Sequence, residues 1–248
     1  MKHKKRIEVC LTNSLFGNYE TENRTVVVAD ILRATTAVCT AFKNGAEKLI
    51  PVSTVAEARK MKEKGYIVAA EREGEKLDFA DYGNSPFNFT EENVKGKTIV
   101  YSTTNGTSAM QMAGGASLVV IGSFINLSSL CGWLNEKGMA VTVLCAGRKG
   151  RFCLEDAVFA GALCEKLIQT GNFYSACDSA FASMTLWSSA RSDLKGYLEN
   201  ARQRHRLKKK GLDNILDYTY TPDTTSVVPV LTGNCLVGYE HALQNKLL

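Results

Sequence analysis

Three carboxylates stand at points where an apolar, strand-like run gives way to a loop: Asp30, Glu71 and Asp156. Oxygen ligands from separate loops suit Mg²⁺, which keeps several waters and takes a substrate phosphate as a further ligand. We therefore predict a Mg²⁺ site at these three acids, and we expect Asp30, Arg33 and Asp156 to be catalytic. Glu155 is adjacent to Asp156 and could exchange roles with it. Capping of the following helix is the alternative role for an aspartate in such a place.

Groups that donate hydrogen bonds to an anion concentrate at the same kind of junction. Arg33 in RATT (33–36) offers a planar fork that matches a phosphate or a sulfonate. In STTNGTSA (102–109), Gly106 lets the backbone approach a ligand, and the helix expected after it begins with free amides. A surface arginine beside a capping threonine, and an ordinary Asn or Thr helix cap, are the alternatives.

A third set of donors lies in YGNSPFNF (82–89), whose composition predicts a turn. The turn is either a plain loop or a lid that contacts the substrate. Arg72 and Arg148 are candidates for binding a sulfonate or a carboxylate group. Together, the residues that we predict to bind substrate are Thr35, Thr36, Arg72, Asn84, Ser85, Thr104, Asn105, Gly106, Thr107 and Arg148.

A cysteine nucleophile is the competing chemistry. Cys145 and Arg151 are separated by five residues and follow a strand-like run, as in the loop of a cysteine phosphatase. That route would need no metal, so chelation by EDTA would separate it from the Mg²⁺ site. The eight cysteines contain no CxxC pair, and the chain has only three histidines, so a zinc site of the usual kind is not expected.

These residues must be positioned by an α/β fold, because short β-branched runs alternate with helical segments. Strands are expected at 6–12, 25–30, 48–53, 66–70, 97–102, 117–122 and 140–145. Helices are expected at 35–44, 54–65, 105–113, 126–137 and 154–170. The alternation predicts a mostly parallel sheet with helices on both faces. Such sheets bind ligands outside the carboxyl ends of their strands, which is where the acids and donors lie.

The remainder of the chain is interpreted as part of one α/β domain that spans residues 1–248. Residues 175–218 are predicted to form a helical extension within it. The stretch 225–238 is predicted to form one or two short strands that close the sheet at an edge.

Composition and charge are ordinary for a soluble globular protein, and they are compatible with an anionic small-molecule substrate without pointing to one. Apolar residues make up 45% and charged residues 22%, and the net charge of +5 is mild. The basic run at 202–210 lacks interleaved aromatics for base stacking, so we interpret it as a solvated helix end and expect no nucleic-acid partner. Arg206 or His205 could still reach a substrate anion. The chain shows no secretory signal and no bilayer-length apolar run, so we expect a cytoplasmic protein without a membrane partner, with a homo-oligomer left open.

Taken in order, the motifs resemble those of the 2-phosphosulfolactate phosphatase (ComB) family. The resemblance extends over residues 5–240. It is carried by VVVADILRATTAV, AERE followed by DYGNSP, YSTTNGTSAM, GSFINLSSL and CAGRKGRFCLEDAVFAGAL. Two departures from the family pattern, Ala70 in place of a glycine and the stretch DFADYGNSP, lie beside the predicted lid.

This resemblance implies a three-layer α/β/α fold with a largely parallel, mixed sheet. It also implies a Mg²⁺-dependent phosphatase that hydrolyses (2R)-2-phosphosulfolactate to sulfolactate and phosphate, a step towards coenzyme M. Whether a water or the Asp30 carboxylate attacks the phosphorus is left open. A phosphatase for another small phosphorylated acid and a non-catalytic anion- or metabolite-binding protein are the alternative functions.

Overall fold

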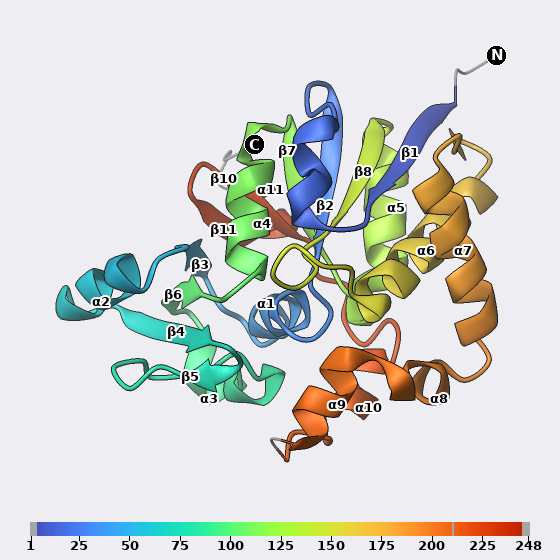
Figure 1. The fold of residues 1–248 in the computed structure, drawn as a ribbon. Coiled ribbons are helices and arrows are strands. Elements are labelled where there is room, and N and C mark those ends of the chain that lie inside the picture. Colours follow the sequence, from blue (N-terminus) through green and yellow to red (C-terminus); the bar gives the residue numbers. More distant parts are fainter. Residues whose placement is uncertain (1–3, 210, 245–248) are drawn as a thin grey trace.

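The computed structural model describes residues 4–209 and 211–244, and it contains one sheet of eleven strands (Figure 1). The strands are β1 (Lys5–Cys10), β2 (Arg24–Ala29), β3 (Lys48–Pro51), β4 (Ile67–Arg72), β5 (Glu75–Lys76), β6 (Thr98–Ser102), β7 (Leu118–Gly122), β8 (Ala140–Cys145), β9 (Phe173–Tyr174), β10 (Pro229–Thr232) and β11 (Cys235–Gly238). The α-helices are α1 (Ala34–Lys43), α2 (Val55–Glu63), α3 (Glu91–Val94), α4 (Gly106–Met112), α5 (Leu127–Lys137), α6 (Leu154–Gln169), α7 (Asp178–Ala190), α8 (Leu194–Tyr197), α9 (Arg202–Lys209), α10 (Ile215–Tyr220) and α11 (Tyr239–Gln244). In this described part of the chain, none of the helices combines the length and the apolarity that crossing a lipid bilayer requires.

The sheet consists of two parallel groups of strands joined by an antiparallel hairpin. Its strand order is β5-β4-β6-β3-β11-β10-β7-β2-β8-β1-β9. Strands β1, β2, β7, β8 and β9 are parallel to one another, and so are β3, β4 and β6. The β10–β11 hairpin pairs antiparallel with β7 on one side and with β3 on the other. The predicted α/β architecture with a largely parallel, mixed sheet is therefore confirmed.

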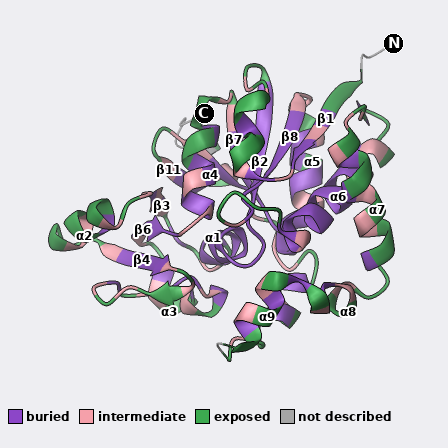
Figure 2. Ribbon diagram, in the orientation of Figure 1, coloured by how far each residue is buried: buried purple, intermediate pink, exposed green. Residues whose placement is uncertain are grey.

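Helices cover both faces of the sheet, as the alternate residues of β2 show. Val27 and Ala29 belong to a core shared with α5, α6 and α7, whereas Val26 and Val28 belong to a second core shared with α1 and α4. All six residues of β2 are buried, and Figure 2 shows the buried colour running through the central strands. A strand covered on both faces needs an unbroken apolar run, which the three consecutive valines provide. This sandwich of helices around the sheet gives the three layers.

The twist of the sheet brings the carboxyl ends of both parallel groups to one region. Along the ladder the two groups run in opposite senses, because three antiparallel pairings separate β7 from β3. Twist accumulates from strand to strand, and Figure 1 shows β4 and β6 steeply inclined to β2 and β8. Residues at or after the ends of β2, β4, β6 and β8 consequently line a single cleft.

The prediction that residues 225–238 close the sheet at an edge is wrong. Strands β10 and β11 lie in the middle of the sheet, between β7 and β3. Leu236 and Val237 are fully buried there. Local periodicity identifies two apolar strands and a turn, but it does not say which strands lie beside them.

The helical extension predicted at 175–218 is interrupted by turns and forms α7, α8, α9 and α10. Asp193 caps a new helix at α8, which ends the continuity of the stretch. Within α9, Arg204 is buried and pairs with Glu199 and Asp213. Part of the basic run is therefore structural, because a buried guanidinium requires acidic partners.

A close helix contact positions the helix that carries two of the candidate acids. Glu155 and Asp156 lie in the first turn of α6, which packs along α7. A Cβ atom on Gly161 of α6 would overlap the carbonyl group of Ser183 and lie 2.9 Å from the amide nitrogen of Met184. The absence of a side chain at Gly161 thus lets the two helices approach and fixes where the acids stand.

We expect Gly161→Ala to destabilise the protein by about 1–3 kcal/mol, because an added methyl group must push α6 away from α7. Gly132→Ala is the matched control. Gly132 is exposed in the middle of α5, and nothing lies within 4 Å of a Cβ added there. In that position alanine should stabilise the helix by about 0.5–1 kcal/mol. Urea unfolding of the two variants measures both changes, and a Gly161→Ala protein as stable as the parent would contradict the contact.

Candidate active site

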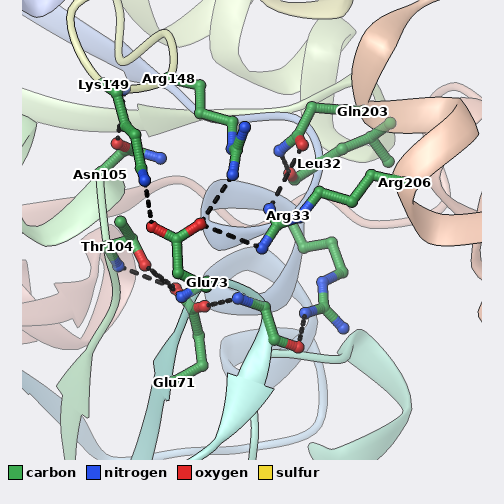
Figure 3. A network of polar contacts seen from close by, with 11 residues as sticks. Leu32, Arg33, Glu71, Glu73, Thr104, Asn105, Arg148, Lys149, Gln203 and Arg206 are labelled. Carbon is green, nitrogen blue, oxygen red and sulfur yellow. Dashed lines mark hydrogen bonds and ion pairs between the residues drawn. The ribbon is translucent and has the colours of Figure 1, made fainter. Parts of the chain in front are cut away.

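One cleft collects the polar residues that follow the strands. Its lining comes from the loops after β2, β6 and β8, from the β4–β5 turn, from the 82–89 loop and from α9 (Figure 3). The lining residues are Asp30, Leu32, Arg33, Glu71, Glu73, Gly74, Asn84, Thr104, Asn105, Arg148, Gln203, Arg206 and Leu207. Side chains from widely separated parts of the sequence thus meet in one place.

Asp30 lies in this cleft, one residue beyond the end of β2, and is 9% exposed. The chain turns sharply there, because the amide of Asp30 donates to Thr35 Oγ1 at 3.0 Å. The amide of Ala34 donates to Asp30 Oδ1 at 3.3 Å. A Cβ on Gly106 would overlap the Ala34 side chain and lie 3.1 Å from Asp30 Oδ2. Glycine at 106 therefore allows α4 to approach the carboxylate. The approach expected from the sequence is to a bound anion, but Gly106 is not among the residues that line the cleft.

Two further acids, from α6, interact electrostatically with Asp30 without lining the cleft, and they are bonded differently. Asp156 accepts hydrogen bonds from the amides of Ile31 at 2.9 Å and Gly147 at 3.1 Å, so each carboxylate oxygen joins a different loop. Glu155 is 1% exposed, and its Oε2 atom has no hydrogen-bond partner. A buried polar atom without a partner is unfavourable, and in native structures it often marks a missing ion or water.

The acids share one electrostatic environment. Burial, helped by the charge of a neighbouring acid, raises the pKa of Asp30 to about 6 and the pKa of Glu155 to about 7. Burial also raises the pKa of Asp156 well above its usual range, with the Glu155 and Asp30 charges adding to it. Ionising these acids together is therefore unfavourable, and a bound cation would offset the repulsion between their charges.

The carboxylates fit a divalent ion that needs few protein ligands. Among residues 4–209 and 211–244, no three His, Cys, Asp or Glu side chains form a ready-made metal site. Mg²⁺ can be held by one or two carboxylates with waters and substrate. Glu71 already accepts hydrogen bonds from Thr104 and from the amide of Gly74. Asp30, which faces the cleft, and Glu155, with its unpartnered oxygen, therefore fit Mg²⁺ better than Glu71 or Asp156.

Three guanidinium groups also line the cleft. Arg33 is 6% exposed and donates to the carbonyl oxygen of Gly74 at 3.1 Å. Arg148 pairs with Glu73 at 2.7 Å, and Arg206 lies 3.6 Å from the same carboxylate. Two of these arginines, Arg33 and Arg148, are among the predicted anion-binding residues, and Arg206 is the one that could reach the site from the basic run.

The two-residue turn between β4 and β5 is the part of the cleft that the sequence reasoning missed. Glu73 and Gly74 both have positive φ, 55° and 78°, and lie between the paired residues Arg72 and Glu75. These values are typical of a tight hairpin turn whose second position favours glycine. The sequence EGE contained that signal, since a residue followed by glycine between two strands indicates such a turn. Gln203 and Leu207 of α9 carried no comparable signal.

Several predicted substrate ligands do not line the cleft. Thr35 accepts the hydrogen bond of the Asp30 amide, and Thr36 bonds to Ile31 and Ser123. Thr107 and Thr103 bond reciprocally through side chains and amides, so the Thr107 amide already has a partner. All three predicted threonines are fully buried. They shape the loops that carry Asp30 and Asn105, although neither α1 nor α4 has a side-chain hydrogen bond from its N-cap residue.

Arg72 and Ser85 also lie outside the cleft. Arg72 directly follows Glu71 on β4, so its side chain points to the opposite face of the strand. There it donates to the carbonyl oxygen of Ser53 at 2.8 Å and to Ser102 Oγ at 3.0 Å. Asn84 does line the cleft and accepts a hydrogen bond from the hydroxyl of Tyr101. Thr104 and Asn105 line it as well.

The geometry does not favour Cys145 as a nucleophile. Its side chain is fully buried in the core, and burial raises the pKa of its thiol well above the usual range. A cysteine nucleophile needs a lowered pKa, so that the thiolate is present near neutral pH. Arg151, the predicted partner, is exposed at the end of a turn closed by backbone hydrogen bonds with Arg148.

Comparison with known proteins identifies one family. The sequence model of the 2-phosphosulpholactate phosphatase family matches residues 10–234. A probable 2-phosphosulfolactate phosphatase of Caldanaerobacter subterraneus is 33% identical over 224 residues, which is 89% of this chain and 92% of the relative. Proteins of the same description from Thermotoga maritima and Clostridium acetobutylicum are 35% and 32% identical. These two alignments cover 87% and 92% of this chain, and 92% and 97% of the relatives.

Cys145→Ala should leave phosphate release from a phosphomonoester within about twofold of the parent, because a buried protonated thiol takes no part in the reaction. Some loss of stability is expected from the small cavity. The rate is therefore measured at a temperature at which circular dichroism shows both proteins folded. A loss of activity of a hundredfold or more in the folded variant would restore the cysteine route.

The metal-free protein should be more stable at pH 5.5 than at pH 8. The folded state holds protons on Asp30 and Glu155 up to about pH 6 and 7, whereas the unfolded chain releases them near pH 4. Stability therefore falls as the pH rises between these limits, by a few kcal/mol in order of magnitude. Melting temperatures in EDTA at the two pH values measure this change.

Asp30→Asn isolates the effect, since it removes one of the titrating groups. The difference between the two melting temperatures should shrink in this variant, whereas Asp178→Asn, an exposed aspartate at the start of α7, should leave it unchanged. A parent protein that melts at the same or a higher temperature at pH 8 would contradict the electrostatics described above.

Proposed function

The chain belongs to the 2-phosphosulpholactate phosphatase family, and from this premise we propose that it hydrolyses the phosphate monoester of a small acid that carries a second anionic group. The proposed substrate is (2R)-2-phosphosulfolactate, and the products are sulfolactate and phosphate. The proposed cofactor is Mg²⁺. The enzyme is thus a phosphoric monoester hydrolase.

One observation carries the proposal: buried carboxylates and guanidinium groups line the same small cleft. Asp30, Arg33, Arg148 and Arg206 all line it. A substrate with a phosphoryl group and a sulfonate would bring several negative charges into this space. Planar guanidinium groups bind both kinds of anion through paired hydrogen bonds, so three of them suit a ligand with two anionic groups.

In the proposed reaction each group of the chain has a separate task. Arg33 binds the phosphoryl oxygens, because it is the most buried of the three arginines and the nearest in sequence to Asp30. Arg148 and Arg206 bind the second anionic group nearer to solvent. Asp30 and Glu155 hold the metal ion, which when bound would offset phosphoryl charge and lower the pKa of a water.

The same charges explain why carboxylates can stand beside a polyanionic substrate. Asp30 and Glu71 would repel such a ligand if their charges were not balanced. Arg33 feels the charges of Glu71 and Asp30, which favour its own charged form against the effect of burial. Acids and arginines thus support each other, and the substrate adds to a nearly neutral cleft. Asp156 keeps the loops in place without touching the ligand.

The test is phosphate release from a panel of small phosphomonoesters, with Mg²⁺ and with EDTA. We expect activity only with the metal, and the highest kcat/KM for an ester that bears a sulfonate or carboxylate. Asp30→Asn should lower kcat/KM by about two to three orders of magnitude, as the loss of a central electrostatic group does. Asp178→Asn is the control and should match the parent.

The outcomes separate the candidate functions. If the folded protein released no phosphate from any ester while an anion still raised its melting temperature, a binding role would replace catalysis. Full activity in EDTA would remove the metal from the proposal.

A further inference from the structure

The turn between β4 and β5 already holds an anion against the basic side of the cleft. The Glu73 carboxylate lies 2.7 Å from Arg148 Nη2, 2.7 Å from Lys149 Nζ and 3.6 Å from Arg206 Nη2 (Figure 3). These cations come from two separate segments, the loop after β8 and helix α9. One carboxylate therefore meets the positive charges that a second anionic group of a substrate would need.

The next residue extends the same arrangement deeper into the cleft. The carbonyl oxygen of Gly74 accepts the hydrogen bond of Arg33 Nη2 at 3.1 Å. Oxygen atoms of the successive residues Glu73 and Gly74 thus contact the guanidinium groups of two different arginines, Arg148 and Arg33. A small molecule with two anionic groups would present oxygen atoms to the same pair of guanidinium groups.

We propose that Glu73 is a built-in competitor of the substrate: its carboxylate stands where an anionic group of the substrate binds, and a ligand enters by displacing it. Glu73 is then a specificity-determining residue, since only a ligand with enough negative charge replaces it. This inference rests on the proposed function of the cleft.

The exposed fractions of these side chains agree with displacement of the Glu73 carboxylate by a ligand. The side chains of Glu73 and Lys149 are 49% and 60% exposed, and ion pairs so open to water are weak. Arg148 and Arg206 are less exposed, at 16% and 24%, so they remain in the cleft when the acid leaves. Their charges would then be without that partner until a ligand arrives.

The turn can also move without disturbing the rest of the sheet. Strand β5 has two residues and lies at the edge of the sheet, where it pairs only with β4 in the described structure. Opening the turn breaks the hydrogen bonds from the Glu73 amide to Thr104 and from the Gly74 amide to Glu71. Such short edge segments lie at the low-stability end of local opening.

The test uses inorganic sulfate as the probe, with binding measured by calorimetry on the full chain. Glu73→Gln keeps the shape of the side chain and removes its charge. We expect its dissociation constant for sulfate to fall by about three- to tenfold, because each exposed pair contributes up to about a fivefold factor. An unchanged or higher dissociation constant would overturn the proposal and indicate that Glu73 only holds the arginines in position.

Two controls test whether the gain in sulfate affinity is confined to the site around Glu73. Asp78→Asn removes one charge from an exposed residue beyond β5 that pairs with Arg59, so it should leave sulfate binding unchanged. In an Arg148→Gln background, Glu73→Gln should give less than about a twofold gain, because the competing site has lost its main cation. Equal gains in both backgrounds would mean that Glu73 acts through general charge, which also overturns the proposal.

An activity measurement distinguishes a failure of this inference from a failure of the proposed function. In Glu73→Gln, the KM of a phosphomonoester with a second anionic group should fall by the same factor as the sulfate dissociation constant. An ester without that second group should gain less. If the protein releases no phosphate at all, the proposed function fails, but the sulfate experiment still decides whether Glu73 competes for the anion site.

Discussion

The rest of the site depends on a carboxylate that does not line the cleft, that of Asp156. Its two oxygens accept the amides of Ile31 and Gly147, which follow Asp30 and precede Arg148. Strands β2 and β8 pair directly in the sheet. Beyond the strand ends, Asp156 holds the two loops that follow them at a fixed separation. Because α6 supplies Asp156, the packing of α6 on α7 determines the spacing between the acid and the arginine of the cleft.

This arrangement gathers negative charge in a buried place. Asp30, Glu155 and Asp156 each have a raised pKa, and burial is the largest cause for each. Such a cluster lowers stability at neutral pH, and a protein retains one mainly where binding or chemistry needs it. The hydrogen bonds to Asp156 offset part of the penalty. One oxygen of Glu155, in contrast, has no hydrogen-bond partner.

Much of this could be predicted from the sequence because strand ends carry local signals. Asp30, Asn105 and Arg148 each follow an apolar run closely, and parallel strands bring such positions together. Arg72 could not be placed as easily. Its side chain points to one face of the sheet or the other according to the exact register of β4, and a shift of one residue reverses that face. The central position of β10 and β11 was missed for another reason: pairing partners far apart in sequence leave no local pattern. Glu73 was missed because its role arises only when α9 and the loop after β8 meet the turn.

The two parallel groups of the sheet divide the work of the cleft between them. The β2 and β8 loops supply Asp30 and Arg148, and the ends of β4 and β6 supply Glu71 and Thr104. The β10–β11 hairpin separates these groups in the sheet and contributes no residue to the cleft lining. The elements that contact the outer part, the β4–β5 turn and α9, are short and peripheral. Chemistry thus resides at rigid strand ends, whereas the choice of ligand resides in segments that can change without altering the sheet.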